Sequence, residues 1–443
     1  MFSKIRLSFM NINYKLFFAL LALGFVPTIY NTLRVFFLGQ FPGEWSYSIA
    51  GQLTWVNLLY EIINEAIILP LFYFMGRVKD DKKEFSNRVR TGMLISLLIY
   101  VVLSIVVLIF AESLLAFMAT DESIIPASAV YIRIESVANI FLVLMQFALV
   151  VLITVERSKY LYIFTGMRLI FCLFSDTLLV STLPISANLG VNGIGYSNII
   201  VNVLLLVVAI VFLSKEKIYV FTKAKYNFMW IKEFMKIGGL SGIESFVRNI
   251  AYIVMVARMV NVVSEQGTYW VANNFIWGWL LLPVLQLGEL IKQEIATDKE
   301  NIRKNTIGYF GITAIILILW FVSIPCWKPF MVKVLGFTDV EKLFGLVMIL
   351  IGFYVLFAVQ NVFDATFYGL GKTNYMLFES VVTNLLYYSV AFILYLMDVW
   401  NPTLTGIALL FGIGNAFDSI VSFSAYIFLL KKHKINILDV ENI

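Results

Sequence analysis

The chain has 443 residues, of which 60% belong to the hydrophobic set and 14% are charged. Soluble domains average about 45–50% apolar and about 25% charged residues, so this composition excludes an ordinary water-soluble fold and indicates a membrane protein with many spans. The net charge is +5, but the basic residues fall in short loops between apolar runs. That placement favours a role in membrane topology over nucleic-acid binding.

Cysteine and histidine are scarce. The cysteines are Cys172 and Cys326, and the single histidine is His433 near the C-terminus. These counts exclude a disulfide scaffold, a cysteine-ligated metal site and a histidine-based catalytic pair within the spans. We therefore expect no bound metal and no cofactor, and we do not expect an enzyme.

Apolar runs long enough to cross the bilayer repeat along the whole chain. A helix of about 20 residues crosses the hydrocarbon layer, and the continuous runs disfavour the alternating pattern of a β-barrel. The sequence predicts an all-α membrane protein with twelve spans, at approximately 15–38, 49–75, 91–111, 128–154, 161–182, 191–213, 233–256, 269–296, 305–325, 343–368, 374–396 and 404–430.

The basic residues orient these spans. Most of the 33 lysines and arginines fall at the N-terminus, in the even-numbered loops and in the C-terminal tail. The opposite side holds only Arg258, Lys328, Lys333 and Lys342. By the positive-inside rule, we expect a multi-pass protein of the plasma membrane with both termini in the cytoplasm.

Similar segments recur in the two halves of the chain. Gly24 matches Gly239, the loop at 81–92 matches 297–308, and Gly193 matches Gly406, all at a nearly constant spacing. Six spans per half is an even number, so the repeats are parallel. They predict an N-lobe (1–214), a linker (215–232) and a C-lobe (233–443), packed around a central cavity. Parallel repeats of this kind are typical of transporters that work by alternating access.

Ionisable residues inside the spans are the candidate functional residues, because each costs at least about 2.5–3.5 kcal/mol at bilayer depth. The candidates for cation or proton coupling are Asp176, Glu61, Glu65, Glu244, Asp364 and Asp418. The candidates for the substrate cavity are Arg34, Asn31, Arg168, Arg248, Asn202 and Asn57.

Some of these charges have a structural interpretation. Glu244 with Arg248, and Glu289 with Lys292, have the spacing of ion pairs on one helix face, and Glu294 is expected at the cytoplasmic interface. Five carboxylates have no basic residue at helical spacing in their own span: Glu61, Glu65, Asp176, Asp364 and Asp418. For these the sequence leaves open a coupling role and a partner on another helix, such as Arg34 or Arg168 for Asp176.

Small and aromatic residues mark two further features. Pro27 in span 1 and Gly238, Gly239 and Gly242 in span 7 indicate either bent helices at a binding site or close helix packing. Trp270, Trp277 and Trp279 in span 8 indicate either an aromatic wall for an organic cation or an interfacial belt.

Several segments resemble the multidrug and toxic compound extrusion (MATE) transporters. They are "NTLRVFFLGQ" (31–40), "IAGQLTW" (49–55), "FSDTLLV" (174–180), "LGVNGIGYSNIIVN" (189–202) and "GLSGIESFVRN" (239–249). The resemblance covers nearly the whole chain. It implies export of bulky, often cationic or amphiphilic compounds, driven by inward H⁺ or Na⁺.

Two positions depart from the pattern that this resemblance implies. Many members carry an aspartate near the end of span 1, where this chain has Arg34. The span 5 motif usually places an asparagine four residues before the aspartate, whereas here Cys172 precedes Asp176. Arg34 is then either a partner of Asp176 or an attractor of an anionic substrate.

The sequence thus predicts a monomeric, cation-coupled exporter of small molecules that works by rocker-switch alternating access. One alternative is a flippase of an anionic lipid-linked precursor, which Arg34, Arg168 and Arg248 would favour if they converged on the cavity. A more remote alternative is an integral-membrane enzyme. A major-facilitator transporter is disfavoured because the loop after span 2 lacks that family's glycine-and-arginine signature.

Overall fold

The computed structural model describes all residues except 1, 42–44, 156–158, 221–224, 433–434 and 436–443. In the described residues every regular element is helical, which confirms the all-α prediction. His433 and part of the predicted linker, 221–224, lie outside the described residues.

Each predicted span corresponds to a helix or to a run of joined helices. Eleven described helices are long and apolar enough to cross a membrane, and a bent helix pair makes up to twelve. They are α2 (Tyr14–Gly39), α3 (Ser46–Gly51) with α4 (Leu53–Gly76), α5 (Lys82–Phe117), α6 (Ile125–Thr154), α7 (Lys159–Leu179), α8 (Gly190–Lys215), α9 (Ile231–Ala251) with η1 (Tyr252–Ala257) and α10 (Arg258–Val262), α13 (Asn301–Lys333), α14 (Val340–Gly369), α15 (Thr373–Thr383) with η3 (Asn384–Tyr388) and α16 (Ser389–Leu396), and α17 (Leu404–Lys432).

Span 8 is the bent pair. It consists of α11 (Gln266–Phe275) and η2 (Ile276–Leu280), followed after a 52° bend by α12 (Leu282–Thr297). Pro283 lies in the first turn of α12. Proline has no backbone N–H to donate and its ring clashes with the preceding turn, so a helix bends or restarts at this position.

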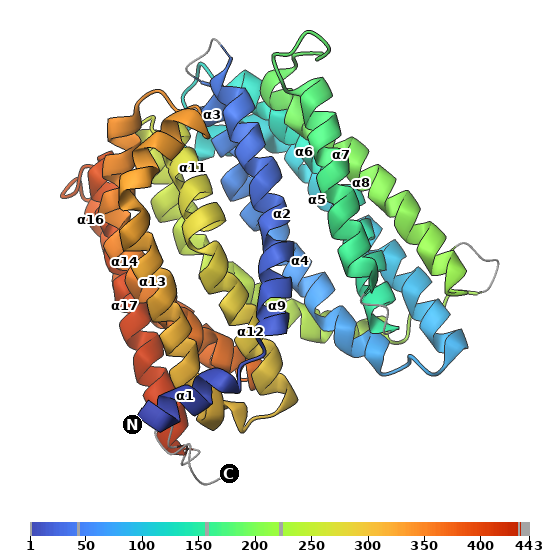
Figure 1. Ribbon diagram of the computed structural model, residues 1–443. Helices are drawn as coiled ribbons and strands as arrows, with labels where there is room; N and C mark the ends of the chain where they lie inside the picture. Colours follow the sequence, from blue (N-terminus) through green and yellow to red (C-terminus); the bar gives the residue numbers. More distant parts are fainter. Residues whose placement is uncertain (1, 42–44, 156–158, 221–224, 433–434, 436–443) are drawn as a thin grey trace. The chain divides into compact units, whose positions relative to one another are not determined.

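The structure adds one helix that the sequence did not predict, α1 (Phe2–Met10). It packs on the N-terminal part of α13, as Figure 1 shows. The hydroxyl of Ser8 accepts a hydrogen bond of 2.8 Å from the backbone N–H of Gly308. Gly311 faces the ring of Phe9, and a Cβ built on that glycine would lie only 2.2 Å from the ring, so the close approach depends on glycine there.

Backbone contacts divide the chain into two compact units. We call Leu33–Trp270 the continuous unit, and Met1–Thr32 together with Val271–Ile443 the split unit. Helix α2 begins in the split unit and ends in the continuous unit. These boundaries differ from the halves 1–214 and 233–443 expected from the repeat, and the division by repeat stays a prediction.

In the continuous unit, α6 lies at the centre and packs on α4, α5 and α8. α9 packs along α4, so the span that opens the second repeat is held by the span 2 helix of the first. Gly238 makes this possible: a Cβ built there would lie 2.1 Å from the carbonyl oxygen of Ala66. Small residues let helix backbones approach closely in a membrane, so the packing interpretation of Gly238 is correct for this contact.

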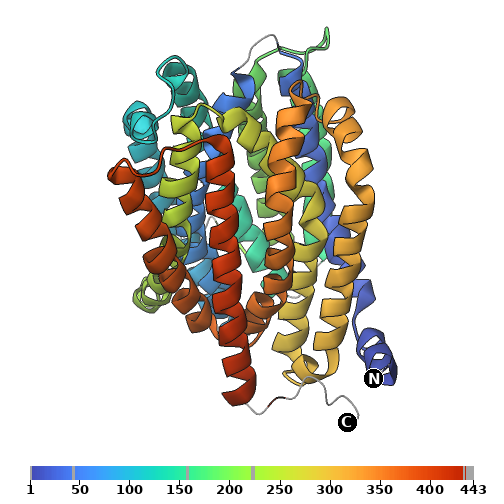
Figure 2. The same ribbon diagram turned by 90° about the vertical axis from the view of Figure 1, so that its left-hand side faces the viewer.

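In the split unit, α14 occupies the corresponding central place. It packs on α12, α13, α15 and α17, and Figures 1 and 2 show α13, α14 and α17 running lengthwise beside one another. The side of α14 that faces α17 carries a ring contact between Phe363 and Tyr426 with centroids 4.8 Å apart.

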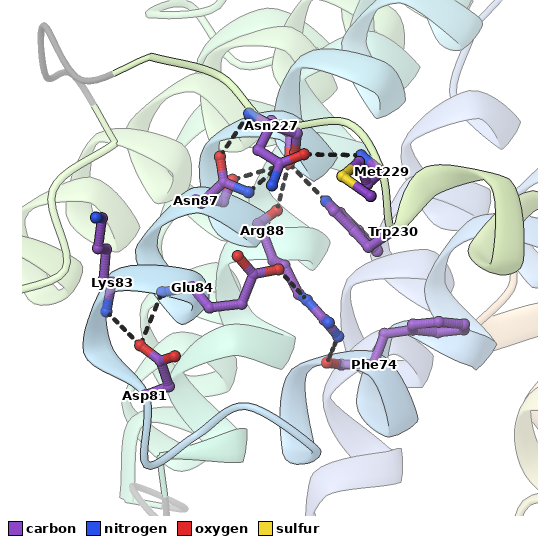
Figure 3. Close-up of polar contacts among 10 residues, drawn as sticks. Phe74, Asp81, Lys83, Glu84, Asn87, Arg88, Asn227, Met229 and Trp230 are labelled. Carbon is purple, nitrogen blue, oxygen red and sulfur yellow. Dashed lines mark hydrogen bonds and ion pairs between the residues drawn. The ribbon is translucent and has the colours of Figure 1, made fainter.

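The end of the linker is fastened to α5, as Figure 3 shows. The side-chain amide of Asn87 donates to the carbonyl of Asn227, and the backbone N–H of Asn227 donates to the Oδ1 of Asn87, both at 2.9 Å. Trp230 donates from its indole Nε1 to the hydroxyl of Thr91 at 2.9 Å, and the guanidinium of Arg88 lies 5.5 Å from the Trp230 ring centroid. The start of α9 is therefore attached to the continuous unit at several points.

Candidate ion and substrate sites

The first candidate site is a buried ion pair between α2 and α7. The Nε of Arg34 lies 2.7 Å from Oδ2 of Asp176, and Nη2 of Arg34 lies 3.1 Å from Oδ1, so the pair is bidentate. The side chain of Arg34 is 8% exposed and that of Asp176 is fully buried. Of the two partners that the sequence left open for Asp176, the structure selects Arg34.

This pair extends into a network that also contains a second acid. Nη2 of Arg34 donates to Oδ1 of Asn198 at 2.8 Å, and the Asn198 amide donates to Oε1 of Glu135 at 2.8 Å. Glu135 is buried as well, at 4% exposure. The network thus places one guanidinium beside two carboxylates, so the protein itself supplies a cation at Asp176.

Arg168 lies eight residues before Asp176 on α7 and is bonded differently. Its Nη2 donates to Oδ1 of Asn202 at 3.3 Å, and the Asn202 amide donates to the carbonyl of Ala138 at 3.1 Å. Among the described residues no carboxylate lies within ion-pair distance of Arg168. Its charge is only partly buried.

The second candidate site lies between α4 and α9. Nη1 of Arg248 lies 3.0 Å from Oε1 of Glu244, as the i,i+4 spacing predicted, and Nη2 lies 2.7 Å from Oε1 of Glu65. Glu61, one turn before Glu65 on α4, is exposed and has no hydrogen bond or ion pair among the described residues. Two carboxylates thus pair with Arg248, and a third, that of Glu61, interacts with it electrostatically.

The third candidate site lies in the split unit. The carboxylate of Asp364 on α14 accepts a hydrogen bond of 2.7 Å from the hydroxyl of Ser422 on α17. Asp418 on α17 accepts from the amide of Gln360 at 2.8 Å and from the hydroxyl of Thr383 at 2.6 Å. The donors to both acids are neutral, in contrast to the arginines of the continuous unit.

Comparison with known proteins identifies the architecture. Residues 79–178 match the MatE family model. A multidrug resistance MATE family transporter of the MOP superfamily in an inward-facing conformation has a TM-score of 0.75 and 16% sequence identity, over 92% of this chain and 95% of that chain. An outward-facing conformation of such a transporter has a TM-score of 0.68 and 17% sequence identity, over 97% of this chain and 96% of that chain.

The chain has the fold of the MATE transporters. A MOP superfamily transporter from Pyrococcus furiosus, for which the reverse polarity of the binding pocket suggests a different function, has the same fold with a TM-score of 0.70 and 16% identity, over 98% of this chain and 99% of that chain. No curated protein matches the chain significantly by sequence. At these identities, the solved structures establish the fold.

Within the MATE fold, the two departures seen in the sequence meet at one place. Arg34, which stands where the resemblance implies an aspartate, pairs directly with Asp176, the acid of the span 5 motif. Cys172, which replaces the expected asparagine, is buried. The MATE-type acid of the continuous unit is therefore retained, but its charge is matched by an arginine.

The remaining predicted residues have different positions. Asn31 and Asn57 are exposed and make no hydrogen bond among the described residues. Glu294 accepts from the backbone N–H of Asn13 at 2.8 Å, from Asn305 at 2.9 Å and from the hydroxyl of Tyr309. Glu294 therefore ties α12 to α13 and to the start of α2, and the structural interpretation is favoured.

Two of the three tryptophans of span 8, Trp277 and Trp279, are hydrogen-bonded within the split unit. Trp277 donates to the hydroxyl of Tyr354 at 3.2 Å, and Trp279 donates to that of Thr32 at 3.0 Å. Lys292 pairs with Glu289 at 2.6 Å, as its spacing predicted. Two buried acids were not among the candidate residues: Glu135 on α6, which is 4% exposed, and Glu379 on α15, which is 3% exposed. An acid in an apolar span was the signal that could have identified both.

Proposed function

We propose that the chain is a secondary-active exporter of bulky cationic or amphiphilic compounds, coupled to inward H⁺ or Na⁺. The MATE fold supports alternating access, since the related transporters have both inward-facing and outward-facing structures. The observation that carries the preference for cations is the excess of acid around Arg248, where Glu61, Glu65 and Glu244 surround a single arginine.

The exposure of two polar side chains on α4 supports a preference for organic cations. Glu61 and Asn57 lie one turn apart on α4, and both are exposed in the middle of a spanning helix. A charged side chain facing hydrocarbon costs at least about 2.5–3.5 kcal/mol, so this face of α4 is better suited to a water-filled path than to lipid. A path with unneutralised carboxylates attracts organic cations and repels anions.

The pairing of the arginines also favours the exporter. Two of the three arginines that would have recruited an anion are neutralised, Arg34 by Asp176 and Arg248 by Glu65 and Glu244. The candidates for coupling that lack a basic hydrogen-bond partner are Glu61, Asp364 and Asp418. We assign coupling to this group, with a monomer as the transporting unit.

Transport by the purified protein in liposomes tests the proposal. Efflux of a fluorescent organic cation is measured under an imposed H⁺ or Na⁺ gradient, for the wild type, Glu61→Gln and the control Glu112→Gln, whose acid pairs with Arg133 at the outer end of α5. We expect gradient-driven efflux that falls in Glu61→Gln and persists in the control. Efflux independent of both gradients contradicts antiport.

Arg168 supports a second candidate function, a flippase of an anionic lipid-linked precursor. Among the described residues its hydrogen-bond partner is the neutral Asn202, whereas Arg34 and Arg248 pair with carboxylates. If an anionic lipid-linked compound is translocated faster than the organic cation, and Arg168→Gln abolishes that translocation, the flippase replaces the exporter.

A further inference from the structure

Three helices of the split unit enclose a carboxylate pair joined by one amide. Nε2 of Gln360 on α14 donates to Oε1 of Glu379 on α15 at 2.6 Å and to Oδ2 of Asp418 on α17 at 2.8 Å. The hydroxyl of Ser419 donates to the amide oxygen of Gln360 at 2.7 Å, which fixes the amide with its nitrogen toward both acids. A single neutral donor group therefore bridges two carboxylates from different helices.

The second carboxylate oxygen of Glu379, Oε2, has no hydrogen-bond donor among the described residues. Glu379 and Gln360 are each only 3% exposed, and Oε2 itself is enclosed. A buried polar atom without a partner costs about 1–3 kcal/mol, and more when it is charged. Oε2 therefore requires either a hydrogen-bond donor or a proton of its own.

In the described part of the chain, no lysine or arginine forms an ion pair with Glu379 or Asp418. Glu379 lies within hydrogen-bonding reach of Asp418, and Asp364 on α14 acts electrostatically on both acids. From α12, Lys292 acts on Asp364, but its ammonium is 2.6 Å from Glu289. Three acids thus face one another with neutral donors between them. Two carboxylates in contact repel unless a proton lies between them.

We propose that Glu379 and Asp418 form a proton-binding site, sharing one proton in the state described, with Gln360 as the positioning residue that holds the two acids together. The acid that carries the proton donates a hydrogen bond to the carboxylate of the other acid, and the proton removes one negative charge from the bilayer interior. The described residues contain no group of three or more histidine, cysteine, aspartate or glutamate side chains placed to hold a metal ion. The site rests on the proposed antiport, for which it supplies the proton carrier.

The geometry also indicates how a proton would be released. The site joins α14, α15 and α17, and α15 continues into α16 through the π-helical turn η3. π-Helical turns break the regular hydrogen-bond ladder and are common at functional sites. A small rotation of α15 would separate Glu379 from Asp418, break the shared hydrogen bond and leave two acids that each hold a proton less tightly.

Infrared spectroscopy of the purified protein tests the site without transport. We expect a carbonyl band of a buried protonated carboxyl that is lost in Glu379→Gln and is lost or shifted in Asp418→Asn. Glu289→Gln is the control, because this acid is partly exposed and paired with Lys292. Glu379→Asp retains an acid and should keep a shifted band, which separates loss of the proton from loss of the fold. An unchanged band in Glu379→Gln overturns the proposal.

Transport in the same variants separates the site from the function. If a proton gradient drives the wild type, Glu379→Gln should lose that dependence while still equilibrating substrate down its own gradient. If the band behaves as expected but no gradient drives the wild type, the antiport fails and the site stands. If a proton gradient drives the wild type and Glu379→Gln alike, the site fails and the antiport stands. Sodium-driven transport that is lost in Glu379→Gln, with no carboxyl band, also overturns the proton site.

Discussion

The buried guanidinium of Arg34 has both of its bonded nitrogens committed to acceptors, Asp176 and Asn198. A buried ion pair contributes little net stability compared with an apolar replacement, because both charges lose their hydration. Removing one partner is different, since it leaves the other charge buried and uncompensated. Arg34 is therefore needed wherever Asp176 and Glu135 are ionised.

Replacing Arg34 alone tests this argument. We expect Arg34→Gln to destabilise the protein by about 3–5 kcal/mol, the usual cost of breaking a buried pair, measured as a loss of thermal stability in detergent. The double variant Arg34→Gln/Asp176→Asn should recover much of the loss because it removes both charges. The exposed pair of Arg77 with Glu233 provides the control, and Arg77→Gln should change stability by less than about 1 kcal/mol. A double variant as unstable as the single one contradicts the account.

The limits of sequence reasoning are visible at the same scale. The pair of Glu244 with Arg248 was predictable because both lie on one helix face at i,i+4. The bond from Arg248 to Glu65 joins residues on two helices and depends on how those helices rotate about their axes. The spacing of residues along one helix does not determine that rotation. For the same reason, the sequence could not predict that Gln360 bridges Glu379 and Asp418.

At the scale of elements, the contact between α4 and α9 depends on where each glycine points. Gly238 faces the backbone of Ala66, whereas Gly239, the next residue, has nothing within 4 Å of a built Cβ. The sequence showed only a glycine-rich stretch and left bending and packing open. The direction of each Cα–Cβ bond, which the helix geometry fixes, decides between them.

These neighbouring glycines form a matched experiment. We expect Gly238→Ala to lower stability by about 1–3 kcal/mol, because the methyl group would force α4 and α9 apart. Gly239→Ala should be neutral or stabilising by up to about 1 kcal/mol, because alanine favours the helix. Thermal unfolding in the same detergent compares the two. Equal losses in both variants would show that the contact with Ala66 is unimportant.

The attachment of the linker to α5 makes a prediction about local opening. Trp230→Ala removes the bond to Thr91 and the ring beneath Arg88. We expect faster hydrogen exchange in residues 225–230 and at the start of α9, because local opening then breaks fewer contacts. Met229→Ala is the control, since its side chain is 85% exposed. Exchange that rises equally in both variants contradicts the anchoring role of Trp230.

At the scale of the whole molecule, the apolar runs predicted the number of spans and the limits of most of them to within a few residues, because bilayer thickness and helix rise fix their length. Two helices extend further than predicted: α5 begins nine residues before the expected 91–111, and α13 ends eight residues after the expected 305–325. α1 escaped prediction because a nine-residue helix is too short for the spanning criterion. Its stability comes instead from packing on α13. The orientation in the membrane stays a prediction from the positive-inside rule.

Cysteine labelling tests that orientation. In a Cys326→Ser background, which leaves only the buried Cys172, a membrane-impermeant maleimide should label Glu122→Cys in intact cells. Asp80→Cys should be labelled only after the cells are permeabilised. Both substituted positions are exposed in loops that follow successive spans. The background protein without either substitution is the control, and the reverse labelling pattern would place the termini outside.

The split unit has a consequence for synthesis of the protein. Roughly 240 residues separate Thr32 from Val271, which at about 5–20 residues per second takes about 12–48 s to translate. During that interval the hydroxyl of Thr28 has no Gly278 carbonyl to bond, the contact that it makes at 2.9 Å in the folded protein. The first half of α2 therefore lacks its packing partners in the split unit until the chain beyond Val271 has been synthesised. A nascent chain stopped before Val271 would retain an N-terminal segment without its native packing partners.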